Sequence, residues 1–489
     1  MKQKNNAPKK DRRNWKYGSL SVAISLVFIA AVILVNVLVG VATDRFSIKF
    51  DMTSDSRFAI SRETKDVLKE MDQNVTVYVF ATETNYRSLV FGNEIVEMLY
   101  RYQAASDGKL TVAFIDPLRN PEFVNKYKSE VSTVSEYSLI VEDATGKFRT
   151  ISMEDVYYWY DSTRTRVVGI SLERRLTAAL LWLESDVQPV AAILTGNGEI
   201  GYGGLVSLLT DSNYQVISLN LLTDEIPENV ELIVISSPST DYTPDEINKL
   251  DKYFAQYKRA IVSIGAESPS LPELEQFLGE WGISYGKSIL LDSQYKIGND
   301  YSAVASSPLS TSTDTLLNGI TSYIIAPYSR PLTTLWASSD RFNGRITTPL
   351  LTTSTQSYAK PFVEGETIST FEREDGDVSG PFYTAVLTTQ TTIVDNITVE
   401  GGILFLSSPY VYNESLLNTN SYGNMTLMSN VLGEFNKSGV KVNIKNKSFA
   451  APELAVIGNQ LTVILVLLAL IPAALLIMGG VVWYRRKNR

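Results

Sequence analysis

Three glycines carry the strongest chemical signal in this sequence of 489 residues. Gly196, Gly198 and Gly201 lie in the segment TGNGEIGYGG, directly after an apolar run (residues 190–194) that reads as a β-strand. Their spacing matches G-x-G-x-x-G, which in dinucleotide-binding folds joins a strand to a helix beside a pyrophosphate. That chemistry also requires an acid at the end of the next strand, but the run at 214–219 ends without one. We therefore favour a tight turn that needs glycine dihedrals, and we predict no cofactor.

Four acidic residues are expected near this turn. Because the carboxyl ends of parallel strands meet at one edge of a sheet, where such folds bind ligands, these acids could hold a cation or contact a partner. Solvated loop acids are the simpler interpretation. The candidate ligand or partner site consists of the turn and these acids: Gly196, Asn197, Gly198, Glu199, Asp224, Glu225 and Asp241, with no metal assigned.

The composition excludes several catalytic classes. The chain contains no histidine and no cysteine. Their absence removes Ser-His-Asp and Cys-His nucleophiles, CxxC redox pairs, and histidine or thiolate metal sites. Carboxylate chemistry, Ser-Lys chemistry and oxygen-only cation sites remain open, but the acidic turn EREDGD (residues 372–377) lacks the spacing of an EF-hand. We predict no catalytic residues and expect a protein that is not an enzyme.

The elements that position these residues fall into two patterns. Between residues 61 and 183 the order is β-α-β-α-β-β-α after a short capped helix, which is the order of a thioredoxin-like fold without a CxxC motif. From residue 189 onward, strands alternate with helices, as in a doubly wound, mainly parallel sheet. Its expected strands are 190–194, 214–219, 231–236, 260–265 and 288–292. Further strand-like runs beyond residue 315 are extra β-rich segments.

Two long uncharged stretches, residues 18–43 and 460–484, lie near the ends of the chain. Each exceeds the ~20 residues that a helix needs to cross a bilayer, and the first is too long for the apolar region of a signal peptide. Basic residues precede the first stretch and follow the second, which predicts cytoplasmic termini and an extracytoplasmic middle. Asn36, inside the first stretch, is a candidate for hydrogen bonding to a neighbouring membrane helix, although a place near the outer headgroups is equally compatible.

The predicted fold is therefore a membrane-anchored α/β protein with two terminal transmembrane helices and two external domains. The acidic middle lacks the basic patches that nucleic-acid binding needs, so nucleic-acid partners are excluded. The expected segments are a basic tail (1–17), a transmembrane helix (18–43), the thioredoxin-like domain (44–187), the α/β domain (188–450), a second transmembrane helix (460–484) and a basic tail (485–489).

The order of several segments resembles the GldG-type auxiliary proteins of ABC transport systems. These segments include FDMTSDSRFAIS after the first apolar stretch, SLERRLTAAL, LTGNGE, where relatives usually read TGHGE, and ILFLSSPYVYNES. Asn197 stands at the usual histidine position of the family, so any chemistry of that histidine is absent here. The resemblance implies an accessory subunit that acts with an ABC permease and a cytoplasmic ATPase in the bacterial cytoplasmic membrane.

The chain has no Walker A sequence, so ATP hydrolysis must come from a partner. We expect a non-enzymatic accessory subunit of an ABC-type exporter whose external domains engage a partner or cargo. Two alternatives stay open: a cell-surface receptor for a small ligand or glycan, and a hydrolase that uses two carboxylates facing each other across a cleft.

Overall fold

The computed structural model describes residues 58–128, 135–159, 164–201, 203–310, 312, 314–336, 342–362, 368, 370–394, 396–436 and 441–449, and a few isolated positions beyond 450. The chain divides into two compact units, Met1–Ala59 and Ile60–Arg489, and the elements below belong to the second.

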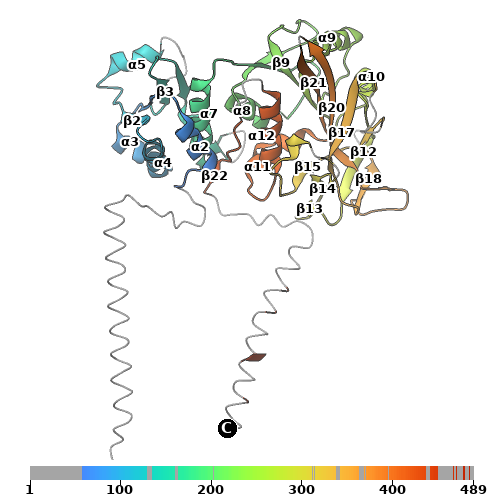
Figure 1. Ribbon diagram of the computed structural model, residues 1–489. Coiled ribbons are helices and arrows are strands. Elements are labelled where there is room, and N and C mark those ends of the chain that lie inside the picture. Colours follow the sequence, from blue (N-terminus) through green and yellow to red (C-terminus); the bar gives the residue numbers. More distant parts are fainter. Residues whose placement is uncertain are drawn as a thin grey trace, which may run out of the picture. The chain divides into compact units, whose positions relative to one another are not determined.

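The N-terminal part of this unit, which contains the elements labelled β2, β3, α2 to α5 and α7 in Figure 1, is built around a four-stranded sheet. Its strand order is β2-β1-β3-β4. Strand β1 is parallel to β2 and antiparallel to β3, and β3 is antiparallel to β4. The strands are β1 (Val75–Val79), β2 (Leu110–Phe114), β3 (Leu139–Asp143) and β4 (Phe148–Ile151). Apolar stripes on α2, α4 and α7 form one core with this sheet. The helices are α2 (Arg62–Glu70), α3 (Glu83–Arg87), α4 (Gly92–Ala105), α5 (Pro121–Lys128), α6 (Met153–Val156) and α7 (Leu172–Glu184).

Local sequence chemistry explains where these elements begin. Ser61 accepts a hydrogen bond from the Thr64 amide and so caps α2, as expected for a serine at this position. The expected order β-α-β-α-β-β-α is present, and α3, α6 and a second small sheet are additions to it. In that sheet β22 (Lys447–Ser448) pairs with β6 (Val167–Ile170), which pairs with β5 (Tyr157–Trp159). Residues near the end of the described chain therefore return to the N-terminal part.

The C-terminal part contains a twelve-stranded sheet whose main path is β13-β14-β17-β20-β21-β10-β9-β7-β8. The strands on the path are β7 (Val190–Leu194), β8 (Gln215–Leu219), β9 (Val230–Ser236), β10 (Arg259–Ser263), β13 (Lys296–Ile297), β14 (Asp300–Pro308), β17 (Arg345–Thr352), β20 (Tyr383–Val394) and β21 (Ile397–Leu406). Strands β11 (Ile283–Tyr285), β15 (Ile324–Pro327) and β16 (Leu332–Thr334) pair beside it.

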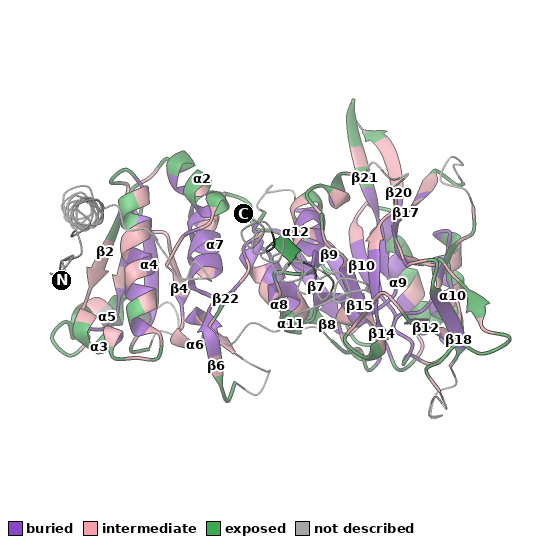
Figure 2. Ribbon diagram, turned by 90° about the horizontal axis from the view of Figure 1, so that it is seen from below, coloured by how far each residue is buried: buried purple, intermediate pink, exposed green. Residues whose placement is uncertain are grey.

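Helices cover both faces of the parallel strands. Alternate residues of β7 point to opposite faces, so Ile193 packs with α8 and α12, and Leu194 packs with α9 and α10. Figure 2 shows these strands and helix faces as buried. The helical elements are α8 (Gly203–Asp211), α9 (Pro244–Phe254), α10 (Pro272–Glu280), α11 (Glu414–Asn418), α12 (Asn424–Phe435) and the 3₁₀ turns η1 (Thr315–Leu317) and η2 (Pro409–Tyr412).

The prediction of a doubly wound, mainly parallel sheet is wrong in two respects. Only β8, β7, β9, β10 and β21 run parallel along the path, and beyond β21 the pairs β21–β20, β20–β17 and β17–β14 are antiparallel. The run at 288–292 forms β12 (Ser288–Asp292) in a separate antiparallel sheet with β18 (Ser357–Pro361) and β19 (Val378–Ser379). The fold is a mixed α/β structure with several sheets. The prediction failed because local periodicity does not indicate which strands far apart in sequence pair with one another.

The predicted membrane-anchored fold is corrected as well. Among the residues that the structure describes, no helix combines the length and the apolar character that a bilayer crossing requires. The segments 18–43 and 460–484, on which that prediction rested, lie outside the described residues except for isolated positions in the second. Asn36 also lies outside them.

Candidate functional site

The glycine turn lies where the sequence places it, between the carboxyl end of β7 and the start of α8. All three motif glycines have positive φ: 119° at Gly196, 72° at Gly198 and 87° at Gly201. Positive φ is strongly disfavoured for residues that carry a Cβ. The backbone path of the turn is therefore sufficient reason for glycine at these three positions.

The turn sits at the point where the strand order reverses, since β8 and β9 lie on opposite sides of β7. In open α/β sheets this is where ligands bind. Here the loop after β9 covers the turn: the Asn197 carbonyl accepts hydrogen bonds from the amides of Ser239 and Thr240 at 2.9 and 3.0 Å. The Ile200 amide also donates to the Ser236 carbonyl at 2.9 Å. Main-chain hydrogen bonds therefore join the two loops across the crevice that a nucleotide would need.

Asn197 is the buried centre of the turn. Its side-chain amide donates to Glu246 Oε1 at 2.9 Å, and both side chains are almost fully buried. The other oxygen of Glu246 accepts from the Thr243 amide at 2.7 Å in the capping box that starts α9. Glu199 accepts from the Asn197 amide at 2.9 Å and from the Tyr242 hydroxyl at 3.0 Å. The structure thus brings Asn197, Gly198 and Glu199 together with two residues that the predicted site did not include, Tyr242 and Glu246.

The three remaining acids of the predicted site serve separate local purposes. Asp241 accepts from the Glu273 amide at 2.8 Å and so caps the first turn of α10. Asp224 accepts from the Asn220 amide at 3.1 Å, which closes a short loop after β8. Glu225 is largely exposed and lies 3.4 Å from Lys249 Nζ. Within the described ranges no group of three acids is arranged to hold a metal ion. The predicted cluster is therefore dispersed over three loops.

A buried hydroxyl cluster lies beside the turn and was not anticipated. Tyr412 places its hydroxyl 2.5 Å from Ser236 Oγ and 2.6 Å from Ser263 Oγ, at the carboxyl ends of β9 and β10. Burial raises the pKa of the Tyr412 phenol to about 12, so the phenol is neutral at physiological pH. Ser-Ser-Pro occurs at residues 236–238, 306–308 and 407–409, but only Ser236 of these serines belongs to the cluster, so this repeat does not identify it in the sequence. The cluster fills the space under this edge of the sheet with satisfied hydroxyl groups.

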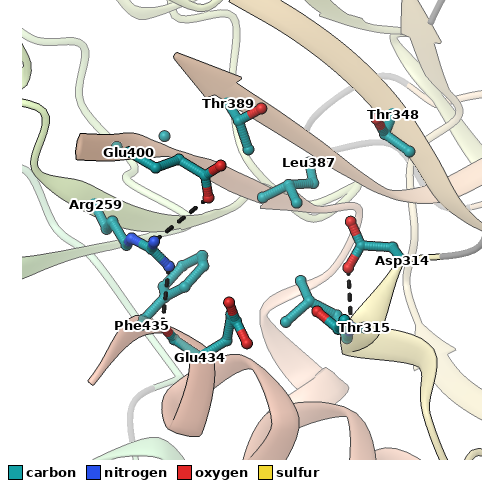
Figure 3. Close-up of a pocket in the computed structure, with 12 residues that line it drawn as sticks. Arg259, Asp314, Thr315, Thr348, Leu387, Thr389, Glu400, Glu434 and Phe435 are labelled. Atoms are coloured by element: carbon teal, nitrogen blue, oxygen red, sulfur yellow. Dashed lines mark hydrogen bonds and ion pairs between the residues drawn. The ribbon is translucent and has the colours of Figure 1, made fainter. Parts of the chain in front are cut away.

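A cavity of about 340 Å³ lies at the opposite edge, where β10 begins (Figure 3). Arg259 crosses it, with Nη2 3.4 Å from Glu400 Oε1 and Nη1 donating to the Glu434 carbonyl at 3.0 Å. Asp314 accepts from the Leu316 amide at 2.9 Å and caps η1. The cavity is acidic, but one carboxylate is paired with a guanidinium and another is a helix cap. This arrangement offers acceptor groups to a cation.

Gly198→Ala tests whether the turn is built for its backbone path. A Cβ at this position would lie 1.9 Å from Ser239 Oγ, and the backbone is left-handed. We expect a loss of about 1–2 kcal/mol in the free energy of unfolding, measured by chemical denaturation, from the backbone conformation alone. Gly203→Ala is the matched control, because a Cβ there meets no atom within 4 Å. An equal effect of both substitutions would contradict this interpretation.

The comparisons with known proteins are sparse. Residues 54–158 match a domain of unknown function, DUF7088, which covers much of the N-terminal part. No curated protein matches the chain significantly. Among solved structures, the mmIFT52 N-terminal domain is 15% identical with a TM-score of 0.36, covering 51% of this chain and 97% of that chain. PurLQS from Thermotoga maritima is 11% identical with a TM-score of 0.29, covering 51% and 100%. These likenesses assign neither a fold family nor a function to this chain.

Proposed function

We propose that this chain is a non-catalytic accessory subunit of an ABC-type transport system in the bacterial cytoplasmic membrane. The observation that carries the proposal is the closed glycine turn. Main-chain hydrogen bonds join the loops that follow β7 and β9. The side chains of Asn197 and Glu199 form hydrogen bonds with neighbouring residues of the fold. An edge built this way supports a rigid surface for a partner better than a cofactor site. The resemblance of the segment order to GldG-type proteins supplies the class of partner.

The proposed contact is the carboxyl edge surface, defined here by Ile200, Leu222 and Tyr328. Ile200 and Leu222 follow the neighbouring strands β7 and β8 and are 42% and 52% exposed. Tyr328 is also exposed, and its carbonyl accepts from the Ala266 amide at 2.7 Å, just beyond β10. Exposed apolar side chains on hydrogen-bonded loops are pre-organised, so a partner that covers them loses little conformational entropy on binding. ATP hydrolysis and the transport path would belong to the partners.

The double variant Ile200→Asp/Leu222→Asp tests this surface. Two charges placed where a partner buries apolar groups are expected to reduce recovery of the ABC permease and ATPase at least tenfold, because single interface anchors are worth about 2 kcal/mol or more. The measurement is affinity purification of the full chain from its native host in mild detergent, with partners quantified by mass spectrometry.

Leu118→Asp is the control for an added charge, to be compared with each single variant as well as the double one, because Leu118 is 91% exposed on the N-terminal part and far from this edge in sequence. Unchanged melting temperatures of all variants would show that folding is intact. Failure of the unmodified chain to recover any ABC component would contradict the proposed class. Recovery that is equal for the double variant and Leu118→Asp would contradict the proposed surface.

A further inference from the structure

A second cavity, of about 430 Å³, lies where the N-terminal and C-terminal parts meet. Its walls come from β4 and α6 on one side and from a single face of α8 on the other. The charged residues that line it are three arginines and two aspartates: Arg149, Arg164, Arg175, Asp155 and Asp211. Its volume falls in the ~300–1,000 Å³ range of small-molecule sites.

The charges around this cavity oppose the local rules for helices. Arg174 and Arg175 lie in the first turn of α7, and Asp211 is the last residue of α8. Cations are unfavourable at a helix N-terminus and anions at a C-terminus, so these three charges do not stabilise their own helices. The gain is tertiary, since Asp211 binds Arg175 Nη1 at 2.7 Å and lies 2.8 Å from Arg174 Nε. Such conflicts between local and global preference mark sites where structure serves a specific purpose.

One carboxylate does not satisfy this group of guanidinium donors. Arg149 gives Nη2 to the Thr210 carbonyl at 3.2 Å, and Arg175 gives Nη2 to Ser207 Oγ at 3.2 Å. Arg149 Nη1 and Arg175 Nε are buried, and no acceptor within the described part of the chain reaches them. Asp155 is 4.0 Å from Arg175, and Arg164 is paired with Glu154. Burial also lowers the pKa of Arg149, an effect that the nearby Arg175 reinforces and Asp211 opposes.

Buried cationic donors without acceptors are costly, and ordered water or a bound ion normally satisfies them. Planar guanidinium groups bind phosphate oxygens in a bidentate fashion. Both ends of α8 line the cavity, at Gly203 and at Asp211, so the helix dipole gives no net preference for an anion and the guanidinium donors alone supply the attraction. We propose that this cavity binds a phosphate-type oxyanion, on a small molecule with one or two phosphoryl groups, through Arg149 and Arg175. The ligand would bridge the two parts of the unit, which goes beyond the proposed transport role.

The test is a thermal-shift and calorimetric titration of the full purified chain with inorganic phosphate, pyrophosphate and citrate, each against sodium chloride of equal ionic strength. Pyrophosphate is expected to raise the melting temperature and to bind at one site per chain. Citrate carries carboxylates and no phosphoryl group, so it distinguishes recognition of phosphate from binding of any anion. Arg149→Gln removes one donor pair at the cavity and is expected to weaken pyrophosphate binding at least tenfold.

Arg119→Gln is the control for lost charge, because Arg119 lies on the surface in a 3.4 Å contact with Asp116. Its pyrophosphate affinity should equal that of the unmodified chain. No shift with pyrophosphate beyond that of sodium chloride would overturn the proposal. Equal weakening by Arg119→Gln would also overturn it, because binding would then follow net charge and not this cavity. If Arg149→Gln lowers the melting temperature without ligand, the affinities measured below that temperature still decide the outcome.

Discussion

Asp211→Asn is expected to lower the free energy of unfolding by about 3–5 kcal/mol, because it leaves the buried Arg174 and the partly buried Arg175 without their shared counter-charge. Asp211 is almost fully buried, and its two oxygens lie 2.7 Å from Arg175 Nη1 and 2.8 Å from Arg174 Nε. Asparagine keeps the size of the side chain, so the loss reports charge and not a cavity. The measurement is urea unfolding of the full chain in phosphate-free buffer, followed by tryptophan fluorescence.

Asp155→Asn provides the comparison for Asp211. Asp155 lies beside the same arginine but at 4.0 Å, and its side chain is partly exposed. Exposed ion pairs contribute about 0–1 kcal/mol, so we expect a change of less than about 1 kcal/mol. Comparable losses at the two aspartates would show that the buried pairing does not organise this boundary.

Glu246→Ala is expected to lower the free energy of unfolding by about 2–4 kcal/mol. The substitution removes the glutamate half of the capping box of α9, so the Thr243 amide loses its acceptor at a cost of about 0.5–1.5 kcal/mol while the Thr243 side chain still caps the helix. It also leaves the buried Asn197 amide without its acceptor, which costs about 1–3 kcal/mol. Hydrogen exchange of residues 195–201 should accelerate, since this glutamate ties the glycine turn to α9. Denaturant unfolding measures the first effect and mass-detected exchange measures the second.

Asp245→Ala is the control for this glutamate, because Asp245 shares the first turn of α9 with its side chain exposed. Its loss should stay below about 1 kcal/mol. A second check uses coupling: if the two side chains act together, Asn197→Ala should cost much less in the Glu246→Ala background than alone. If the losses caused by Asn197→Ala and Glu246→Ala simply add, the hydrogen bond between these two side chains does not hold the turn.

Local sequence patterns predicted the elements of this fold well where a short segment contains the whole signal. The glycine turn and the strand β7 lie where their residues indicate. Each of these signals depends on contacts within a few residues, which propensity rules describe.

Long-range pairing was the part that sequence patterns could not supply. Strand β21 lies next to β10 in parallel, although about 140 residues separate Arg259 from its partner Gly402. An alternating strand pattern states which side chains face the core and says nothing about the neighbouring strand. The expectation of a mainly parallel sheet failed because β20, β17 and β14 extend the sheet in antiparallel orientation beyond β21, which local patterns likewise do not indicate.

The predicted site shows the same limit. Glu199 reads as a solvated loop acid in the sequence, yet it accepts two hydrogen bonds in the fold. Asn197 and Glu246 belong to two recognisable motifs that are 49 residues apart, and only the fold places them in contact. Arg174, Arg175 and Asp211 contradict the charge preferences of their own helices, so local rules would not predict that they come together.

The most direct test of the proposed function is site-specific photo-crosslinking from position 200 in the full chain, carried out in its native cells. A photoreactive residue replaces Ile200, whose side chain is exposed while its backbone groups bond to Ser236. We predict a crosslink to an ABC permease or a component that co-purifies with it, and no such product from position 118. Crosslinks that are absent at position 200, or identical at both positions, would contradict a partner-binding role for the carboxyl edge surface.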